Sequence, residues 1–318
     1  MFELYNKTVN EMEKIALGGE MFKSGFVSII GRTNVGKSSI LNQLVGEKVA
    51  AIANKPQTTR NAIKAIVNRE NSQIIFIDTP GIHKPKTKLG NTMLETVWQS
   101  VPNTDVTLFI IDATSEKIGT GDRIILDKIK ELKAKTILII NKIDLIEKEK
   151  ILKIIELYKN EYNFEAIIPV CSLGNESNEL ILEEIEKILP EGPAYYDKDE
   201  YTDQTGRQIV EEIIREKALK LLNEEIPHGI YVETQKMKFR KTAKNENIYD
   251  IEATIYTLRE SHKGIIIGKN GSMLKNIGMY ARQDLERIFQ TKVNLKIWVK
   301  VKENWQDNSS IVSKFKLK

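Results

Sequence analysis

Glycines and a lysine at residues 31–38 have the spacing of a phosphate-binding loop. The stretch reads G-R-T-N-V-G-K-S and follows the apolar run Phe26–Ile30, matching the pattern G-x-x-x-x-G-K-[ST] between a strand and a helix. The glycines let backbone N–H groups and the helix N-terminus face phosphate oxygens. Lys37 would neutralise the β and γ oxygens, and Ser38 would ligate Mg²⁺. The pattern predicts a nucleoside triphosphate site, but alone it does not choose between ATP and GTP.

The choice of base depends on residues 141–144, which read N-K-I-D. They end a strand-like run, at the sheet edge where ligands bind in open α/β folds. The Asp144 carboxylate can accept hydrogen bonds from guanine N1–H and from the 2-amino group, whereas adenine presents an acceptor at N1. Asn141 can hold the other edge of the base and a neighbouring loop, and the Lys142 stem can cover the purine face. These residues predict a preference for guanine.

Two further stretches supply groups for a metal ion and for the γ-phosphate. Residues 78–81 read D-T-P-G at the end of an apolar run, where Asp78 can hold Mg²⁺ through water and the Gly81 N–H can sense the γ-phosphate. A polar loop after the first helix offers Thr59, or alternatively Thr58, to complete the Mg²⁺ shell. The order of these stretches along the chain supports one shared site.

The residue after Gly81 is Ile82, where Ras-like enzymes place the glutamine that orients the attacking water. No side chain in this stretch replaces that glutamine. The sequence therefore predicts slow intrinsic hydrolysis by positioning and electrostatics, accelerated by a partner. His83 is either a general base or a structural or partner contact.

Short β-branched runs alternate with helical stretches before residue 190, which predicts parallel β-α units. The run Ile63–Val67 is separated from the next strand only by turn-forming residues, too few for a crossover, so this pair should form an antiparallel hairpin. We therefore expect an α/β fold with a mostly parallel sheet and one antiparallel strand. The other expected strands are Phe26–Ile30, Ile74–Asp78, Val106–Asp112, Thr136–Asn141 and Ala166–Val170.

Two prolines and a glycine within residues 189–193 end the preceding helix and mark a domain boundary. The pattern beyond it predicts elements in the order α-β-β-α-α-β, which is typical of a small α+β domain. The expected elements are helix 208–222, strands 231–239 and 249–258, helix 273–289 and strand 292–301.

A second binding motif lies between the last two helices, where residues 265–271 read I-I-I-G-K-N-G. A G-x-x-G loop with a basic centre at a helix start is how KH domains clamp a nucleic-acid backbone. Lys269 and Lys275 are candidate phosphate contacts. Residues 236–318 hold 18 Lys and Arg against 8 Asp and Glu, and this basic excess suits a phosphate polymer.

The composition excludes several classes of protein. With 41% hydrophobic and 29% charged residues the chain can bury ordinary cores, and its apolar runs are strand-sized, short of the ~18 residues that a membrane span needs. The single cysteine, Cys171, cannot form an internal disulfide or a cysteine-based metal cage. Nothing near Met1 resembles a signal peptide. We expect a cytoplasmic protein whose metal ligands are oxygen atoms.

Together these motifs resemble the Era family of bacterial translation-associated GTPases (Era/TrmE type). The resemblance implies that residues 171–173 contact guanine, with a backbone N–H from about Ser172 reaching O6. It also implies GTP hydrolysis and a type II KH domain that binds the 3′ region of 16S ribosomal RNA. A role in maturation of the small (30S) ribosomal subunit and some peripheral association with the inner face of the cell membrane are further implications. The stretches that carry the resemblance are residues 31–38, 56–60, 78–86, 141–144, 211–217, 262–264, 281–282 and 298–301.

The residues expected to act fall into four groups. Catalytic roles are expected for Lys37, Thr59 and Gly81, metal ligation for Ser38, Thr59 and Asp78, and RNA contact for Gly268, Lys269, Asn270, Gly271 and Lys275. Contacts to GTP or GDP are expected from Gly31, Asn34, Val35, Gly36, Lys37, Ser38, Ser39, Asp78, Gly81, Asn141, Lys142, Asp144, Cys171, Ser172 and Leu173.

We expect an N-terminal extension over residues 1–21, a P-loop GTPase domain over 22–190, a linker over 191–206 and a KH domain over 207–318. Within the extension, either Val9–Leu17 is a helix or translation starts at Met21, and the second is favoured.

Two other functions stay open. One is a non-catalytic RNA chaperone that uses GTP as a structural ligand. The other is a regulatory GTPase at the membrane surface, with Lys314, Lys316 and Lys318 as an electrostatic anchor.

Overall fold

A computed structural model describes residues 21–53, 55, 58–82, 85–115, 117–171, 177–222, 226–242 and 245–315, apart from the side chains of residues 227 and 228. The expected N-terminal extension, with its alternatives of a helix over Val9–Leu17 or a start at Met21, involves residues 1–20 and so lies outside the described residues. Among the described residues, no helix has the length and apolarity needed to cross a bilayer.

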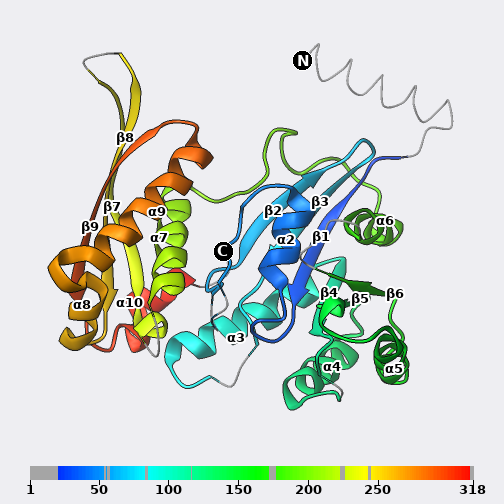
Figure 1. Cartoon of the computed structure of the whole chain (residues 1–318). Helices are drawn as coiled ribbons and strands as arrows, with labels where there is room; N and C mark the ends of the chain where they lie inside the picture. The colour runs from blue at the N-terminus through cyan, green and yellow to red at the C-terminus, as the bar shows by residue number, and fades with distance from the viewer. Residues whose placement is uncertain are drawn as a thin grey trace, which may run out of the picture.

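The first half of the chain forms a six-stranded sheet with the order β2-β3-β1-β4-β5-β6 (Figure 1). Neighbouring strands are parallel except β2, which runs antiparallel to β3, so the predicted hairpin is confirmed. Strands β4, β5 and β6 have the predicted bounds, whereas β1, β2 and β3 are slightly longer than predicted. The strands are β1 Lys23–Ile30, β2 Ile63–Asn68, β3 Ser72–Asp78, β4 Val106–Asp112, β5 Thr136–Asn141 and β6 Ala166–Val170.

Helices cover both faces of this sheet and explain why its strands are continuous apolar runs. One core cluster joins α2 and α6 to one face, and another joins α3, α4 and α5 to the opposite face. The helices are α2 Lys37–Val45, α3 Lys88–Ser100, α4 Thr120–Leu132, α5 Lys148–Lys159 and α6 Asn178–Ile188, with 3₁₀ turns at Val101–Asn103 and Ile143–Leu145.

The second half forms a three-stranded sheet with the order β7-β8-β9, and the order α-β-β-α-α-β is confirmed. Strand β8 is antiparallel to β7 and parallel to β9, and helices α7 and α9 lie together on one face of the sheet (Figure 1). The elements are α7 Gly206–Leu221, a 3₁₀ turn Ile226–Gly229, β7 Tyr231–Lys241, β8 Asn247–Thr257, α8 Glu260–Ile267, a 3₁₀ turn Lys269–Gly271, α9 Ser272–Phe289 and β9 Lys292–Val301.

The predicted linker lies along the edge of the first sheet. Ile66 N–H donates to the Tyr201 carbonyl at 3.0 Å, and Ala65 forms an isolated antiparallel bridge with Thr202. The side-chain oxygen of Gln73 accepts from the N–H groups of Tyr195 and Tyr196 at 2.7 and 2.9 Å. The linker is therefore docked on β2 and β3 by hydrogen bonds.

Three short helical segments follow β9, beyond the last element that the sequence pattern predicts. They are the 3₁₀ turn Trp305–Asp307, α10 Ser309–Val312 and the 3₁₀ turn Ser313–Phe315. Their buried side chains form an apolar cluster with Leu89 and Met93 of α3 and with Tyr231 of β7. This C-terminal segment, Trp305–Phe315, thus joins the two halves of the molecule.

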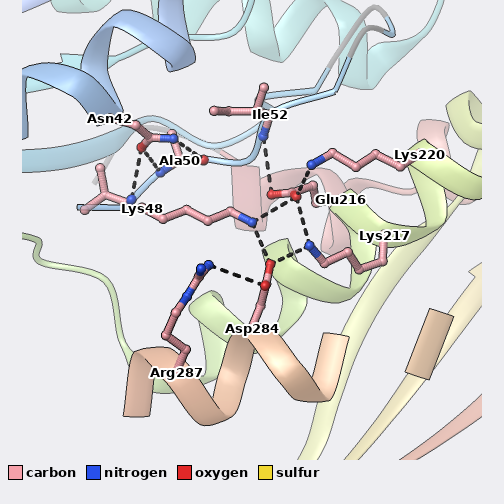
Figure 2. Close-up of polar contacts among 10 residues, drawn as sticks. Asn42, Lys48, Ala50, Ile52, Glu216, Lys217, Lys220, Asp284 and Arg287 are labelled. Carbon is pink, nitrogen blue, oxygen red and sulfur yellow. Dashed lines mark hydrogen bonds and ion pairs between the residues drawn. The ribbon is translucent and has the colours of Figure 1, made fainter. Parts of the chain in front are cut away.

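A cluster of ion pairs joins the two halves at a second place (Figure 2). Lys48, in the loop after α2, contacts Glu216 of α7 at 2.9 Å and Asp284 of α9 at 2.7 Å. Lys217 also contacts both carboxylates. Because the Glu216 side chain is fully buried, its charge needs these partners.

Candidate nucleotide and RNA sites

The phosphate loop lies between β1 and α2, as its sequence predicts. Gly36 precedes the first turn of α2 with φ 102°, a left-handed backbone conformation that glycine adopts without steric cost. Gly31 packs so closely on β4 that an added Cβ would lie 2.4 Å from the Ile110 carbonyl oxygen. Both glycines are therefore required by the path of the loop.

The lysine of this loop is buried and folded back over it. The Lys37 ammonium donates to the carbonyls of Gly31 at 3.2 Å and Arg32 at 3.0 Å. Burial lowers the pKa of Lys37 to about 8, and the negative charge of Asp78 opposes this shift. A buried cation at a helix N-terminus is a suitable partner for phosphate oxygens.

Three oxygen-bearing side chains predicted as metal ligands lie together beside Lys37. The Ser38 hydroxyl is 2.8 Å from Oδ2 of Asp78 and 2.8 Å from the Thr59 hydroxyl, which is 3.2 Å from the same Oδ2. The Thr58 hydroxyl turns away and donates to the carbonyls of Ala53 and Lys55, so the geometry favours Thr59 over Thr58.

The Asp78 carboxyl group fits a magnesium ion in a further respect. Its second oxygen, Oδ1, is buried, and no group in the described part of the chain donates to it. Burial raises the pKa of Asp78, while Lys37 and the two hydroxyl groups oppose the rise. A set of hard oxygen donors with one lone carboxylate oxygen suits Mg²⁺.

Gly81 lies against the phosphate loop. An added Cβ at Gly81 would be 2.7 Å from Cγ2 and 2.8 Å from Cα of Thr33. The next residue, Ile82, donates its N–H to the Gly31 carbonyl at 3.1 Å. The D-T-P-G stretch therefore packs against the phosphate loop, which is where a residue that senses the γ-phosphate has to lie. His83 lies outside the described residues.

Lys37, Ser38, Thr59 and Gly81 line one pocket of about 460 Å³, and the buried Asp78 lies behind its wall, hydrogen-bonded to Ser38 and Thr59. Asp144 and Lys142 lie in its wall together with residues of the phosphate loop, so the base-selecting and phosphate-binding motifs share one cavity. The residues lining it are Thr33, Asn34, Gly36, Lys37, Ser38, Ser39, Ala51, Ile52, Ala53, Lys55, Thr58, Thr59, Gly81, Lys142, Asp144 and Leu145.

Asn141 and Lys142 are fixed by contacts within the protein. The buried Asn141 amide donates to the Val35 carbonyl at 2.7 Å, which ties the base loop to the phosphate loop. Lys142 adopts φ 65° and its ammonium contacts Asp112 at 2.6 Å. Asp112 was not among the predicted residues, although its position at the C-terminal end of β4 was a usable signal.

The expected third guanine contact is described only in part. Cys171, which follows β6, is half-buried, and Ser172 and Leu173 lie outside the described residues. Their contact with guanine stays a prediction.

The G-x-x-G motif forms a turn between α8 and α9 that needs its glycines. Gly268 has φ 74°, Asn270 φ 53° and Gly271 φ 76°, all in the left-handed region. An added Cβ on Gly268 would lie 2.9 Å from the Met273 backbone nitrogen. Lys269 and Asn270 are exposed at the tip of this turn.

A groove of about 890 Å³ runs from this turn between α9 and β9. Of the residues expected to contact RNA, Gly271 and Lys275 line the groove, whereas Gly268, Lys269 and Asn270 do not contribute to its wall. Further polar groups come from three residues that were not predicted to contact RNA, namely Arg282, Lys292 and Asn294. Residues 271, 275 and 282 follow one another at intervals of four and seven residues, which places them on one face of a helix, and this spacing was the signal that could have found Arg282. The apolar side chains that line the groove include Leu274, Leu295 and Ile297.

Comparisons with known proteins agree with this two-site architecture. The family model described as 50S ribosome-binding GTPase matches residues 26–142, and the KH domain model matches residues 225–306. A structure of Era in complex with MgGDPNP and nucleotides 1506–1542 of 16S ribosomal RNA superposes with a TM-score of 0.87 and 41% identity, covering 92% of this chain and 98% of that one. A structure of Aquifex aeolicus Era bound to GDP·AlF4⁻ gives a TM-score of 0.87 at 40% identity, covering 92% and 99% of the two chains.

The fold class expected from the sequence, a P-loop GTPase domain followed by a KH domain, is confirmed. GTPase Era of Clostridioides difficile (strain 630) is 49% identical over 296 residues, which is 93% of this chain and 98% of that protein. With identity at this level along nearly the whole of both proteins, the chain belongs to the Era family of GTPases.

Proposed function

We propose that this protein is a Mg²⁺-dependent GTPase switch that binds 16S ribosomal RNA and acts in maturation of the small ribosomal subunit. The observation that carries the proposal is the single pocket that joins Lys37 and the Ser38–Thr59–Asp78 cluster to Asp144. The residues proposed to bind the phosphates, the metal ion and the base thus meet at one cavity. The domain that follows in the chain carries a basic groove.

Each residue of the pocket has a separate task. Lys37 binds the β and γ oxygens, and the N–H of Gly81 holds the γ-phosphate. Ser38 and Thr59 would ligate the metal directly and Asp78 would do so through water. When bound, Mg²⁺ supplies positive charge that neutralises the phosphate oxygens.

Base selection is assigned to Asp144, with Asn141 holding the base loop against the phosphate loop. The other nucleotide contacts are assigned to Gly31, Asn34, Val35, Gly36, Ser39, Lys142, Cys171, Ser172 and Leu173.

Hydrolysis in this pocket relies on positioning. Ile82 is apolar, so the attacking water is oriented by backbone groups and by the triphosphate, and turnover is slow until a partner completes the site. Lys37, Thr59 and Gly81 are the residues assigned to catalysis.

RNA binding is assigned to the groove between α9 and β9. Gly268, Lys269, Asn270 and Gly271 clamp the backbone, and Lys275 and Arg282 contact phosphates. The structure of a relative bound to nucleotides 1506–1542 of 16S ribosomal RNA supports this assignment. We assign residues 22–190 to the GTPase domain, 191–206 to the linker and 207–318 to the KH domain.

Peripheral membrane attachment is a separate proposal. Of the three lysines expected to anchor the C-terminus, Lys314 is engaged by Glu233 at 2.5 Å and by the Tyr231 hydroxyl at 3.2 Å. Lys316 and Lys318 lie outside the described residues. Flotation with anionic vesicles tests this proposal, and recovery of the protein only at the bottom of the gradient would contradict it.

The deciding experiment is a multiple-turnover GTPase assay with and without RNA of the 16S 3′ region. We expect turnover above background that rises with RNA. A single bound GTP that is never released as GDP would favour the non-catalytic RNA chaperone instead. Cross-linking to cellular RNA in the GTP state then identifies the RNA: enrichment of 16S sequence is expected, and its absence would contradict the proposal.

A further inference from the structure

The loop segment that carries Thr59 is held from outside its own domain. The Lys55 ammonium donates to the carbonyl of Leu222, at the end of α7. Arg215 of α7 donates to the Thr58 carbonyl, and the Arg60 guanidinium donates to the Ile230 carbonyl. The candidate metal ligand Thr59 therefore sits between two residues that are both fixed by the KH half of the molecule.

Arg60 makes the most enclosed of these contacts. Its side chain is 1% exposed, and its guanidinium lies over the Trp305 ring, 5.4 Å from the centroid. Trp305 is fully buried, and its indole N–H donates to the Gly229 carbonyl at 2.9 Å. A planar guanidinium between a carbonyl and an aromatic face has a fixed position and orientation.

Trp305 is itself part of the C-terminal segment that packs on α3. Lys88, the first residue of α3, donates its N–H to Asp307 at 2.8 Å and its ammonium to Ser309 at 2.6 Å. Arg60, beside the candidate metal ligand, and α3, which follows the D-T-P-G stretch, therefore contact the same short segment.

The Thr59 hydroxyl has little freedom to move without leaving its site. It is 2.8 Å from the Ser38 hydroxyl and 3.2 Å from Asp78 Oδ2. A hydrogen bond weakens steeply beyond its normal range, so a backbone shift of about 1 Å would remove it from both partners. Arg60 is the next residue along the chain, and its anchor limits such a shift.

We propose that Arg60 is a positioning residue: by docking on Trp305 and the Ile230 carbonyl, it holds the Thr59 hydroxyl beside Ser38 and Asp78. Affinity for a Mg²⁺-bound nucleoside triphosphate then depends on a contact made in the KH half. The proposal rests on the proposed function of this pocket and adds the route by which the C-terminal segment acts on it.

The test compares affinities for GDP and for the non-hydrolysable analogue GDPNP, both with Mg²⁺, in the full chain carrying Arg60→Met. Methionine replaces the aliphatic stem of arginine with a similar apolar chain and removes the guanidinium with its hydrogen bonds. Affinity for GDPNP should fall by about tenfold, a usual size for coupling between sites. Affinity for GDP should change by less than about twofold, because the Thr59 contact belongs to the triphosphate state.

Lys48→Met is the matched control. Lys48 joins the same two halves of the molecule, but it contacts Glu216 and Asp284 rather than the Thr59 segment, and both carboxylates keep other cationic partners (Figure 2). The ratio of the two affinities should stay at its wild-type value in this variant. If the affinity ratio changed equally in Arg60→Met and Lys48→Met, the effect would belong to the interface between the two halves in general. That result would overturn the proposal.

Two further variants keep the test decisive if Arg60→Met does not fold. Arg60→Lys keeps the charge over the ring but lacks the planar fork, and Trp305→Phe keeps a ring beneath the guanidinium. Each should lower the GDPNP affinity relative to wild type, by less than about tenfold, and leave the GDP affinity within about twofold. A lower melting temperature with an unchanged affinity ratio would show that Arg60 only supports the fold, which would overturn the proposal. Absence of Mg²⁺-dependent binding in the wild-type chain would instead contradict the proposed function.

Discussion

The Cα of Thr33 and the backbone of Gly81 are so close that a Cβ on Gly81 would lie 2.8 Å from that Cα. The contact joins the phosphate loop to the stretch after β3, and the hydrogen bond from Ile82 N–H to the Gly31 carbonyl holds it in register. Because backbone atoms stand on the Thr33 side, no side-chain rotation can make room. The two stretches can approach only while residue 81 is glycine.

Gly81→Ala should therefore separate the two nucleotide states. The methyl group forces the stretch away from the phosphate loop, so affinity for GDPNP should fall by about tenfold or more while GDP affinity stays within about twofold. Gly119→Ala is the control, since among the described residues its Cβ would meet only Asp122 Oδ2, at 3.8 Å. Equilibrium titration with fluorescent nucleotides measures the GDPNP and GDP affinities of both variants. A similar loss of GDP affinity in Gly81→Ala would argue against a role of Gly81 confined to the γ-phosphate.

Asp144→Asn should change the base that is selected. A site built to accept two guanine donors can reject an analogue without them by about 10⁴. The amide should weaken GTP binding and improve binding of xanthosine triphosphate, whose 2-oxo group can accept from it. Competition between the two nucleotides gives the ratio directly, and an unchanged preference for GTP would remove Asp144 from base recognition.

Gly271→Asp should abolish RNA binding and leave the nucleotide site intact. It places a carboxylate at the wall of the α9–β9 groove, where a phosphate should lie. Gly271→Asn is the matched control, because it has the same size and the same strained φ of 76° without the charge. Nucleotide affinity should stay within about twofold in both variants, since the two sites lie in different domains. Equal RNA binding by the aspartate and asparagine variants would show that the phosphate does not lie there.

Arg282→Ala tests a groove residue that the sequence pattern did not single out. Removing one phosphate contact should weaken RNA binding across sequences and reduce the slope of log K against log[salt] by about 0.7. Arg287→Ala, on the same helix but paired with Asp284 at 3.4 Å, should leave the slope unchanged. A filter-binding series over several salt concentrations distinguishes the two, and equal slopes for both variants would place the RNA elsewhere.

Glu216 should make the contact between the two halves of the molecule sensitive to acid. Burial alone would raise the pKa of Glu216, but Lys220, Lys48 and Lys217 outweigh it and lower the pKa below its usual value of 4.5. A carboxylate with a lowered pKa stabilises the folded state above its unfolded pKa, and this contribution is lost as the pH falls through the folded pKa. Stability should therefore decline below about pH 4.5.

Glu216→Gln should remove this dependence. At pH 7 its melting temperature should lie about 2 °C below wild type, the shift that a loss of about 1.5 kcal/mol gives at this size. The difference should shrink as the pH falls from 4.5 through the lowered pKa of Glu216, because the wild-type side chain becomes neutral over that range. The control is Glu183→Gln, because Glu183 is exposed. Scanning calorimetry at pH 7 and below pH 4.5 measures the melting temperatures of both variants and of the wild type. A difference that is the same at both values would show that the charge of Glu216 does not matter.

Local patterns predicted most of the regular structure. Strands β4, β5, β6 and β9 have the predicted bounds. Each is a short run rich in β-branched residues, a composition that favours a strand. The phosphate loop and the G-x-x-G turn were predictable because their glycines meet local backbone requirements.

Contacts between distant segments were not predictable in this way. Arg60 reads as an ordinary loop arginine, and only the fold shows that it is buried on Trp305. The segment Trp305–Phe315 has no long amphipathic period, because its short helices bury side chains against α3 rather than along one extended face. The groove side chains of β9 likewise depend on which strand lies beside α9.

The position of the linker along β2 has a consequence for the solubility of the protein. Strand β2 is the outermost strand of its sheet, and it would otherwise offer free N–H and C=O groups to another chain. The Ile66 N–H donates to the Tyr201 carbonyl, and the Lys64 carbonyl accepts from the Thr202 hydroxyl at 2.8 Å. The connection that tethers the two domains thus also covers a sheet edge. A domain rearrangement large enough to peel it off would expose a template for aggregation.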